Sequence, residues 1–236
     1  MNTRPWEKYL SENDKAHLAA GQHTDVGWGE RPAMLLIDIY RWVMGDRPRP
    51  MLEALKEWPG YTGMAGWNAI PHVQRVLGAA REANVPVFHA TGNPELLHWS
   101  DGRERKRSRS TDPVMEERRK HRFDIIDEVA PIEGEPVIRK SSPSAFMNTQ
   151  LATHLHYIGI DTLIVCGEST SGCVRASVVD GCAHRFKVMV VEEGVWDRHE
   201  TPHAMNLFDM HQKYADVVSA DETVEWLQEW SAGHRS

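Results

Sequence analysis

Apolar residues along this chain gather in short continuous runs, separated by segments with helical spacing. The first run covers residues 33–37 and is followed directly by Asp38. A strand with one wet face alternates apolar and polar positions, so a run without alternation indicates a strand buried on both faces, as in a parallel sheet. Similar strand-like runs follow at residues 85–90, 136–138, 162–166, 187–192 and 215–218.

Helical periodicity fills most of the intervals between these runs. Apolar residues recur every three or four positions within residues 70–80, and helices are also expected over residues 148–158, 173–184, 203–213 and 221–230. Repeated alternation of strand and helix is typical of an α/β fold. The pattern therefore predicts a three-layer αβα sandwich around a mostly parallel sheet of roughly six strands.

The 236 residues of the chain suit one large domain or two small ones. We expect residues 1–30 to form an N-terminal helix and arm, and residues 31–236 to form a single domain. Inside it, about residues 92–127 show no period and include a basic run at residues 103–109. This long loop is either a solvated surface excursion or a patch that binds an anion, a partner subunit or nucleic acid.

Composition narrows the class of protein. A hydrophobic fraction of 41% and a charged fraction of 26% are ordinary for a globular chain. The chain has no apolar run of about 18 residues and no N-terminal signal segment, so we expect no membrane partner and a cytoplasmic location. A net charge of −7 gives no overall footprint for nucleic acid, and three cysteines indicate reduced thiols.

Candidate chemistry lies where the predicted strands end, because parallel sheets bind ligands beyond the carboxyl ends of their strands. Asp38 and Lys140 each follow or close such a strand, and Cys173 follows a glycine-rich loop. Cys173 is predicted to open a helix, whose partial positive charge would lower the thiol pKa. We expect Cys166 and Cys182 to be core residues.

A thiol nucleophile needs a base and donors that stabilise the developing oxyanion. Asp38 could take the thiol proton, Lys140 could keep Asp38 ionised, and backbone N–H groups around Cys173 could serve as the donors. Strand-end aspartates and lysines also pair only to neutralise each other, and the residues alone leave both interpretations open.

Taken together, three segments of the chain resemble the isochorismatase-like cysteine hydrolases. The resemblance spans about residues 29–227 and favours the branch of N-carbamoylsarcosine amidase, biuret hydrolase and maleamate amidohydrolase. The segments are Leu35-Leu36-Ile37-Asp38, Val137-Ile138-Arg139-Lys140 and Val165-Cys166-Gly167-Glu168-Ser169-Thr170-Ser171-Gly172-Cys173-Val174-Arg175.

This resemblance implies a thioester mechanism with Asp38 as the base, Lys140 as its electrostatic partner and Cys173 as the nucleophile. It also implies a cis peptide bond between Glu168 and Ser169, which directs the Ser169 N–H, with that of Cys173, at the oxyanion. No cofactor is expected. Family members are commonly dimers or tetramers, so a homo-oligomer is expected, with the region of residues 58–67 or the basic loop reaching a neighbour.

Four further residues are candidates for substrate contact. Arg198 occupies the place of a family arginine that binds the distal carboxylate or carbonyl of the substrate, unless it only pairs with Asp197 or Asp209. Glu168 either accepts N–H bonds from the substrate or pairs with a cation at the rim. Tyr40 and Trp42 stand where many members carry different pocket residues.

We therefore expect an amidohydrolase acting on a small linear amide or ureide, such as an N-carbamoyl acid, a biuret-like ureide or a maleamate-like half-amide. The alternatives are a nicotinamidase-like hydrolase of an aromatic amide and a non-catalytic binding protein on the same fold. No Asp-x-His triplet occurs between Asp46 and His72, and no histidine spacing resembles a zinc site, so no metal is expected.

Overall fold

The computed structural model of the chain describes residues 4–21, 24–93 and 113–234. The basic run at residues 103–109 lies outside the described residues.

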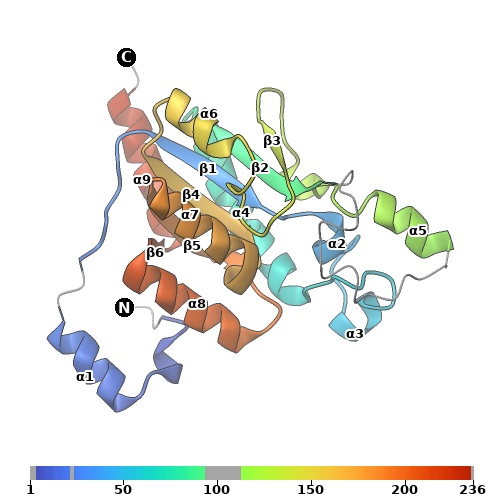
Figure 1. The fold of residues 1–236 in the computed structure, drawn as a ribbon, viewed down its shortest axis with the longest axis horizontal. Helices are drawn as coiled ribbons and strands as arrows, with labels where there is room; N and C mark the ends of the chain where they lie inside the picture. Colours follow the sequence, from blue (N-terminus) through green and yellow to red (C-terminus); the bar gives the residue numbers. More distant parts are fainter. Residues whose placement is uncertain (1–3, 22–23, 94–112, 235–236) are drawn as a thin grey trace.

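Six parallel strands form one sheet in the order β3-β2-β1-β4-β5-β6 (Figure 1). Helices cover both faces, so the predicted αβα sandwich is confirmed. The strands are β1 (Pro32–Ile37), β2 (Val87–Gly92), β3 (Val137–Lys140), β4 (Thr162–Glu168), β5 (Lys187–Trp196) and β6 (Asp216–Val218).

Helices pack on both faces of the sheet, while α1 and α5 lie away from it and bury none of their residues (Figure 1). One core joins the sheet to α6, α7 and α8, and the other joins it to α4 and α9. The described helices are α1 (Glu12–Ala20), α2 (Arg41–Met44), α3 (Met51–Ala54), α4 (Met64–Glu82), α5 (Pro113–Lys120), α6 (Leu151–Tyr157), α7 (Arg175–Ala183), α8 (Glu200–Lys213) and α9 (Ala220–His234).

Strand β1 shows why its sequence does not alternate. Leu35 and Ile37 belong to one core, Met34 and Leu36 belong to the other, and none of the four is more than 2% exposed. Burying apolar surface on both faces stabilises the centre of the sheet, and it fixes the point at which the chain leaves the sheet at Asp38.

One part of the chain differs from the expectation. Residues 113–120 form helix α5 inside the segment that was expected to be an irregular loop. Trp58 is only 5% exposed and packs with Tyr61, Trp42 and Trp67 in a small cluster of its own, and contact of the region of residues 58–67 with a neighbouring subunit stays a prediction. Among the described residues, no helix combines the length and apolar character needed to cross a bilayer.

Candidate active site

Asp38, Lys140 and Cys173 meet at the carboxyl edge of the sheet. The Lys140 Nζ lies 2.7 Å from Asp38 Oδ2 and 3.4 Å from Cys173 Sγ. Strand β2 lies between β3 and β1, and its last residue, Gly92, is the register partner of Lys140. A Cβ added to Gly92 would lie 2.3 Å from the Phe123 ring, so glycine at the end of β2 makes room for that ring, and the Lys140 side chain spans from β3 to the end of β1.

Asp38 is held in an uncommon backbone conformation. It is 1% exposed, its φ is 55°, and its N–H donates to the Ala90 carbonyl at 2.9 Å. Left-handed φ values are uncommon outside glycine, although aspartate adopts them more readily than most residues. Residues in such conformations cluster at functional sites.

Lys140 is a buried cation, 6% exposed, and its ammonium also donates to the Ser142 carbonyl at 3.1 Å. Burial by itself would lower the Lys140 pKa, but the charge of Asp38 and the contact with Cys173 outweigh it and raise the pKa. The ammonium therefore stays charged and holds the Asp38 carboxylate in place.

Cys173 differs from the expectation in two ways. It lies within a π-helical turn, Thr170–Val174, and helix α7 begins only at Arg175. Burial raises the pKa of the thiol, and Asp38 raises it further by its charge and a hydrogen bond, while the charge of Lys140 acts in the opposite direction. The prediction of a lowered pKa is therefore wrong. In the resting protein the sulfur keeps its proton, next to a carboxylate able to accept it.

The other two cysteines differ from each other. Cys166 is fully buried in β4, as predicted, and burial raises the pKa of its thiol. Cys182, in α7, is only partly buried, so its assignment to the core is wrong.

The loop before Cys173 is fixed by contacts that the sequence did not indicate. The peptide bond between Glu168 and Ser169 is cis, as the resemblance implies. The Ser169 carbonyl accepts from the N–H of Gly172 at 2.9 Å and of Val174 at 3.1 Å. Asp197, just after β5, accepts from the N–H and hydroxyl of Ser171 at 2.8 and 2.6 Å. Only its place after a strand, next to Arg198, could have drawn attention to Asp197.

Arg198 does not form the rim ion pairs that were considered for it. Its guanidinium donates to the Gly60 carbonyl at 3.0 Å, and Asp197 accepts instead from the Arg198 backbone N–H at 2.7 Å. Asp209 pairs with Lys213 at 2.6 Å. Within the described residues the guanidinium has no carboxylate partner.

Glu168 lies at the end of β4 and is 9% exposed. Burial raises the pKa of its carboxyl to about 8, the charges of Asp38 and Asp197 add to this effect, and those of Arg198 and Lys140 oppose it. The carboxyl is therefore mostly protonated at neutral pH.

Tyr40 and Trp42 make contacts with the protein itself. The Tyr40 ring meets Phe123 edge-on at 5.3 Å, and the Trp42 ring meets Trp58 edge-on at 6.5 Å. A Cβ added to Gly60 would lie 2.2 Å from the Trp42 ring, so only glycine fits there. Trp42 thus supports the segment whose carbonyl receives Arg198, and contact of either aromatic ring with substrate stays a prediction.

Comparison with known proteins places this site in a family. Residues 32–222, which include all three residues of the Asp38–Lys140–Cys173 cluster, match the isochorismatase domain. The chain belongs to the isochorismatase family.

Individual members of the family resemble the chain over most of its length. It is 37% identical to a maleamate amidohydrolase from Pseudomonas putida over 205 residues, which cover 86% of this chain and 90% of the relative. It is 34% identical to an N-carbamoylsarcosine amidase from an Arthrobacter species over 215 residues, covering 86% and 73% of the two chains. A solved cysteine hydrolase from Pseudomonas syringae pv. phaseolicola shares the fold, with a TM-score of 0.72, 19% identity and coverage of 88% and 98%.

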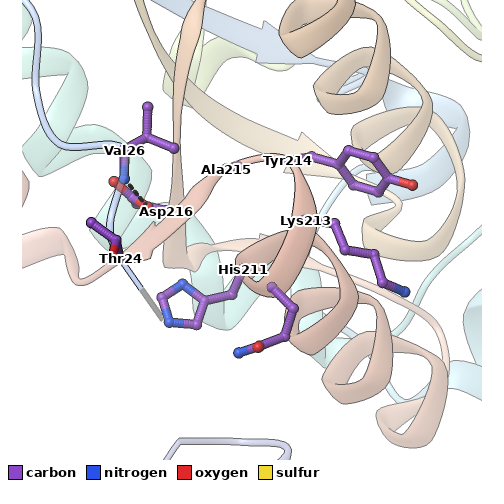
Figure 2. A pocket seen from close by; sticks show the side chains of 8 residues that line it. Thr24, Val26, His211, Lys213, Tyr214, Ala215 and Asp216 are labelled. Atoms are coloured by element: carbon purple, nitrogen blue, oxygen red, sulfur yellow. Dashed lines mark hydrogen bonds between the residues drawn. The ribbon is translucent and has the colours of Figure 1, made fainter. Parts of the chain in front are cut away.

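One group of side chains in this family member has spacing compatible with a metal ion. Asp25, His211 and Asp216 place one ligand atom each within 4.8 Å of one another. His211 and Asp216 also line a cavity of about 270 Å³ (Figure 2). The two Asp216 oxygens already accept the N–H groups of Val26 and Gly27 at 3.0 and 2.7 Å. These bonds attach the N-terminal arm to β6, so the arrangement has a structural explanation.

Proposed function

We propose that the protein hydrolyses the carbon–nitrogen bond of a small linear amide or ureide through a cysteinyl thioester, releasing ammonia. The observation that carries this proposal is the buried Asp38–Lys140 pair, with its ammonium 3.4 Å from the Cys173 sulfur. The amidohydrolase class expected from the sequence agrees with the names of two relatives, a maleamate amidohydrolase and an N-carbamoylsarcosine amidase.

The first half-reaction begins with a neutral thiol. As Cys173 Sγ attacks the substrate carbonyl carbon, its proton passes to the Asp38 carboxylate, and the carbonyl π electrons move to the oxygen. The N–H groups of Ser169 and Cys173 donate to this oxyanion. When the tetrahedral intermediate collapses, Asp38 returns the proton to the departing nitrogen, which leaves as ammonia, and an acyl thioester remains on Cys173.

The second half-reaction uses the same groups with water as the nucleophile. Asp38 removes a proton from a water molecule as the water oxygen attacks the thioester carbon. The Cys173 sulfur then leaves and takes this proton from Asp38. The products are the carboxylic acid and the free enzyme. Lys140 keeps Asp38 ionised at the start of both halves, and the Ser142 carbonyl fixes the direction of the ammonium.

Substrate contacts in this proposal come from Glu168 and Arg198, with Tyr40 and Trp42 as walls of the pocket. The guanidinium of Arg198 is free of carboxylate partners within the described residues, and its planar set of donors suits a carbonyl or carboxylate oxygen. We further propose that the protein acts in the cytoplasm as a homo-oligomer.

The test is ammonia release from a panel of biuret, an N-carbamoyl amino acid, maleamate and nicotinamide. We expect the unmodified protein and Cys182→Ala to release ammonia from at least one linear compound, and Cys173→Ala to release none. Cys182 is a matched control because it lies in α7, outside the proposed machinery. No ammonia from any compound with the unmodified protein supports the binding-protein alternative, and preference for nicotinamide supports the aromatic-amide alternative.

A further inference from the structure

Glu168 is a buried acid at the active-site edge that the two half-reactions do not use. It closes β4 and immediately precedes Ser169, and its register partner on β5 is Trp196. Ile37, the residue before Asp38, is the register partner of Gly167. The backbone therefore brings Glu168 to the same edge of the sheet as Asp38 and Cys173.

The carboxyl of Glu168 has no hydrogen-bond partner among the described residues, although 91% of the residue surface is covered, given its 9% exposure. Other covered acids in the protein are satisfied. Glu135 accepts from Arg81 and the Ile132 N–H, and Asp216 accepts two backbone N–H groups. The carboxyl oxygens of Glu168 are not fully enclosed, so a substrate group at the edge of the site can reach them and supply the partner that the described residues do not.

The charges around Glu168 limit what that partner can be. The charges of Asp38 and Asp197 raise the Glu168 pKa, and those of Arg198 and Lys140 lower it, so two anions and two cations act on this carboxyl. With Glu168 protonated, these charges cancel. A substrate carboxylate at this position would add an anion beside Asp38 and Asp197. If Glu168 were ionised, it would repel that carboxylate as well, so the site offers no net attraction for an anion.

A protonated carboxyl is instead matched to an uncharged carbamoyl group. Its O–H can donate to the carbamoyl oxygen while its C=O accepts from the carbamoyl N–H, which gives two hydrogen bonds in one plane. Arg198 can donate to the second lone pair of the same oxygen. A site that hydrogen-bonds a substrate group in this way strongly rejects analogues that lack it.

We propose that Glu168 makes this enzyme select substrates whose non-reacting end is an uncharged carbamoyl group, as in a biuret-like ureide, over substrates that carry a carboxylate there. This inference rests on the proposed function. The proposed preference differs from the substrates for which two relatives are named, because maleamate and N-carbamoylsarcosine each carry a carboxylic acid group.

The experiment compares kcat/KM for biuret and for maleamate in four proteins: unmodified, Glu168→Gln, Glu168→Leu and Glu192→Gln. The glutamine keeps one donor and one acceptor and can never ionise, whereas leucine keeps the approximate shape without hydrogen bonds. Glu192 is a matched control because it lies on β5 and pairs with Arg4 of the N-terminal arm at 2.8 Å.

We expect the unmodified enzyme to prefer biuret, and Glu168→Leu to lower kcat/KM for biuret by about 10- to 100-fold, the usual effect of an unpaired polar group. The kcat/KM of Glu168→Gln for biuret at pH 7 should stay within about threefold of the value for the unmodified enzyme. Its kcat/KM for maleamate should be higher than that of the unmodified enzyme. That improvement should grow from pH 7 to pH 9, because the raised pKa of about 8 makes Glu168 an anion across this range. Glu192→Gln should behave like the unmodified enzyme.

An active enzyme that prefers maleamate tenfold or more, or whose kcat/KM for biuret is unchanged in Glu168→Leu, would overturn the inference and leave the proposed function intact. Ammonia from no compound at all would overturn both. If Glu168→Leu does not fold, the pH dependence of Glu168→Gln on maleamate decides, and an improvement that does not grow with pH contradicts the inference.

Discussion

Replacing Lys140 with methionine separates the charge of the buried pair from its shape. The two charges lie 2.7 Å apart. At an effective dielectric constant of about 20, Coulomb's law gives an attraction of about 6 kcal/mol for such a pair. This attraction is what allows Asp38, only 1% exposed, to be a carboxylate. Without the ammonium, Asp38 takes up a proton at neutral pH and can no longer accept one from Cys173.

We expect Lys140→Met to lower kcat/KM at pH 7 by about 10²- to 10⁴-fold, the range associated with loss of general base catalysis. Activity should rise about tenfold for each pH unit above neutrality, since raising the pH restores the carboxylate. Stability should fall by about 3 kcal/mol at pH 7, as is usual when one partner of a buried pair is removed. This loss should shrink at acid pH, because a buried aspartate with a raised pKa favours the folded state only while it is protonated.

The assays are ammonia release as a function of pH and urea unfolding at pH 5 and pH 7. Arg139→Met is the matched control, because Arg139 is the neighbouring cation on β3 and its side chain is exposed. Lys140 does not act through its charge on Asp38 if Lys140→Met keeps activity within threefold of the unmodified enzyme at pH 7, or if Arg139→Met shows the same loss.

Three other outcomes follow from the structure. Burial opposes ionisation of Glu135, but hydrogen bonds from Arg81 and His89 outweigh this effect and lower the Glu135 pKa to about 2. Glu135→Gln should therefore lower the free energy of unfolding in urea by up to about 3 kcal/mol at pH 7. This cost should disappear as the pH falls from about 5 to about 2, and an unchanged difference would contradict the assignment. Iodoacetamide should alkylate Cys173 more slowly than free cysteine at pH 7.5, with a rate that rises with pH. It should not reach Cys166 in the folded protein. Rapid alkylation of Cys173 at a rate independent of pH would instead indicate a thiolate with a lowered pKa. Light scattering after size exclusion should give a multiple of 26.9 kDa, and a monomer alone would contradict the expected oligomer.

The sheet was predictable because its central strands are apolar on both faces, and this property is visible in residues 33–37 without any tertiary information. The position of Asp38 at a strand end was visible for the same reason. Lys140 ends β3, an edge strand that is mostly exposed, and only the short apolar pair Val137-Ile138 indicated that strand. Helix α5 was not, since Pro113–Lys120 is strongly charged and buries none of its residues, so it lacks the apolar stripe from which a helix is recognised.

The chemistry of the site was less accessible from the sequence. The direction of the Cys173 pKa depends on how deeply the thiol is buried and how near Asp38 lies, and both are properties of the folded chain. The left-handed backbone of Asp38 and the bond from Arg198 to the Gly60 carbonyl likewise depend on segments far apart in sequence. Local spacing therefore located the reactive groups but could not give their ionisation.

The covalent intermediate tests the account most directly. The enzyme should be mixed with an amide that it hydrolyses, quenched with acid within a turnover, digested and analysed by mass spectrometry. We predict an acyl group on the peptide that contains Cys173, absent from Cys173→Ala and removed by hydroxylamine. Ammonia release without any adduct on that peptide in the unmodified enzyme, together with sustained ammonia release by Cys173→Ala, would contradict the account.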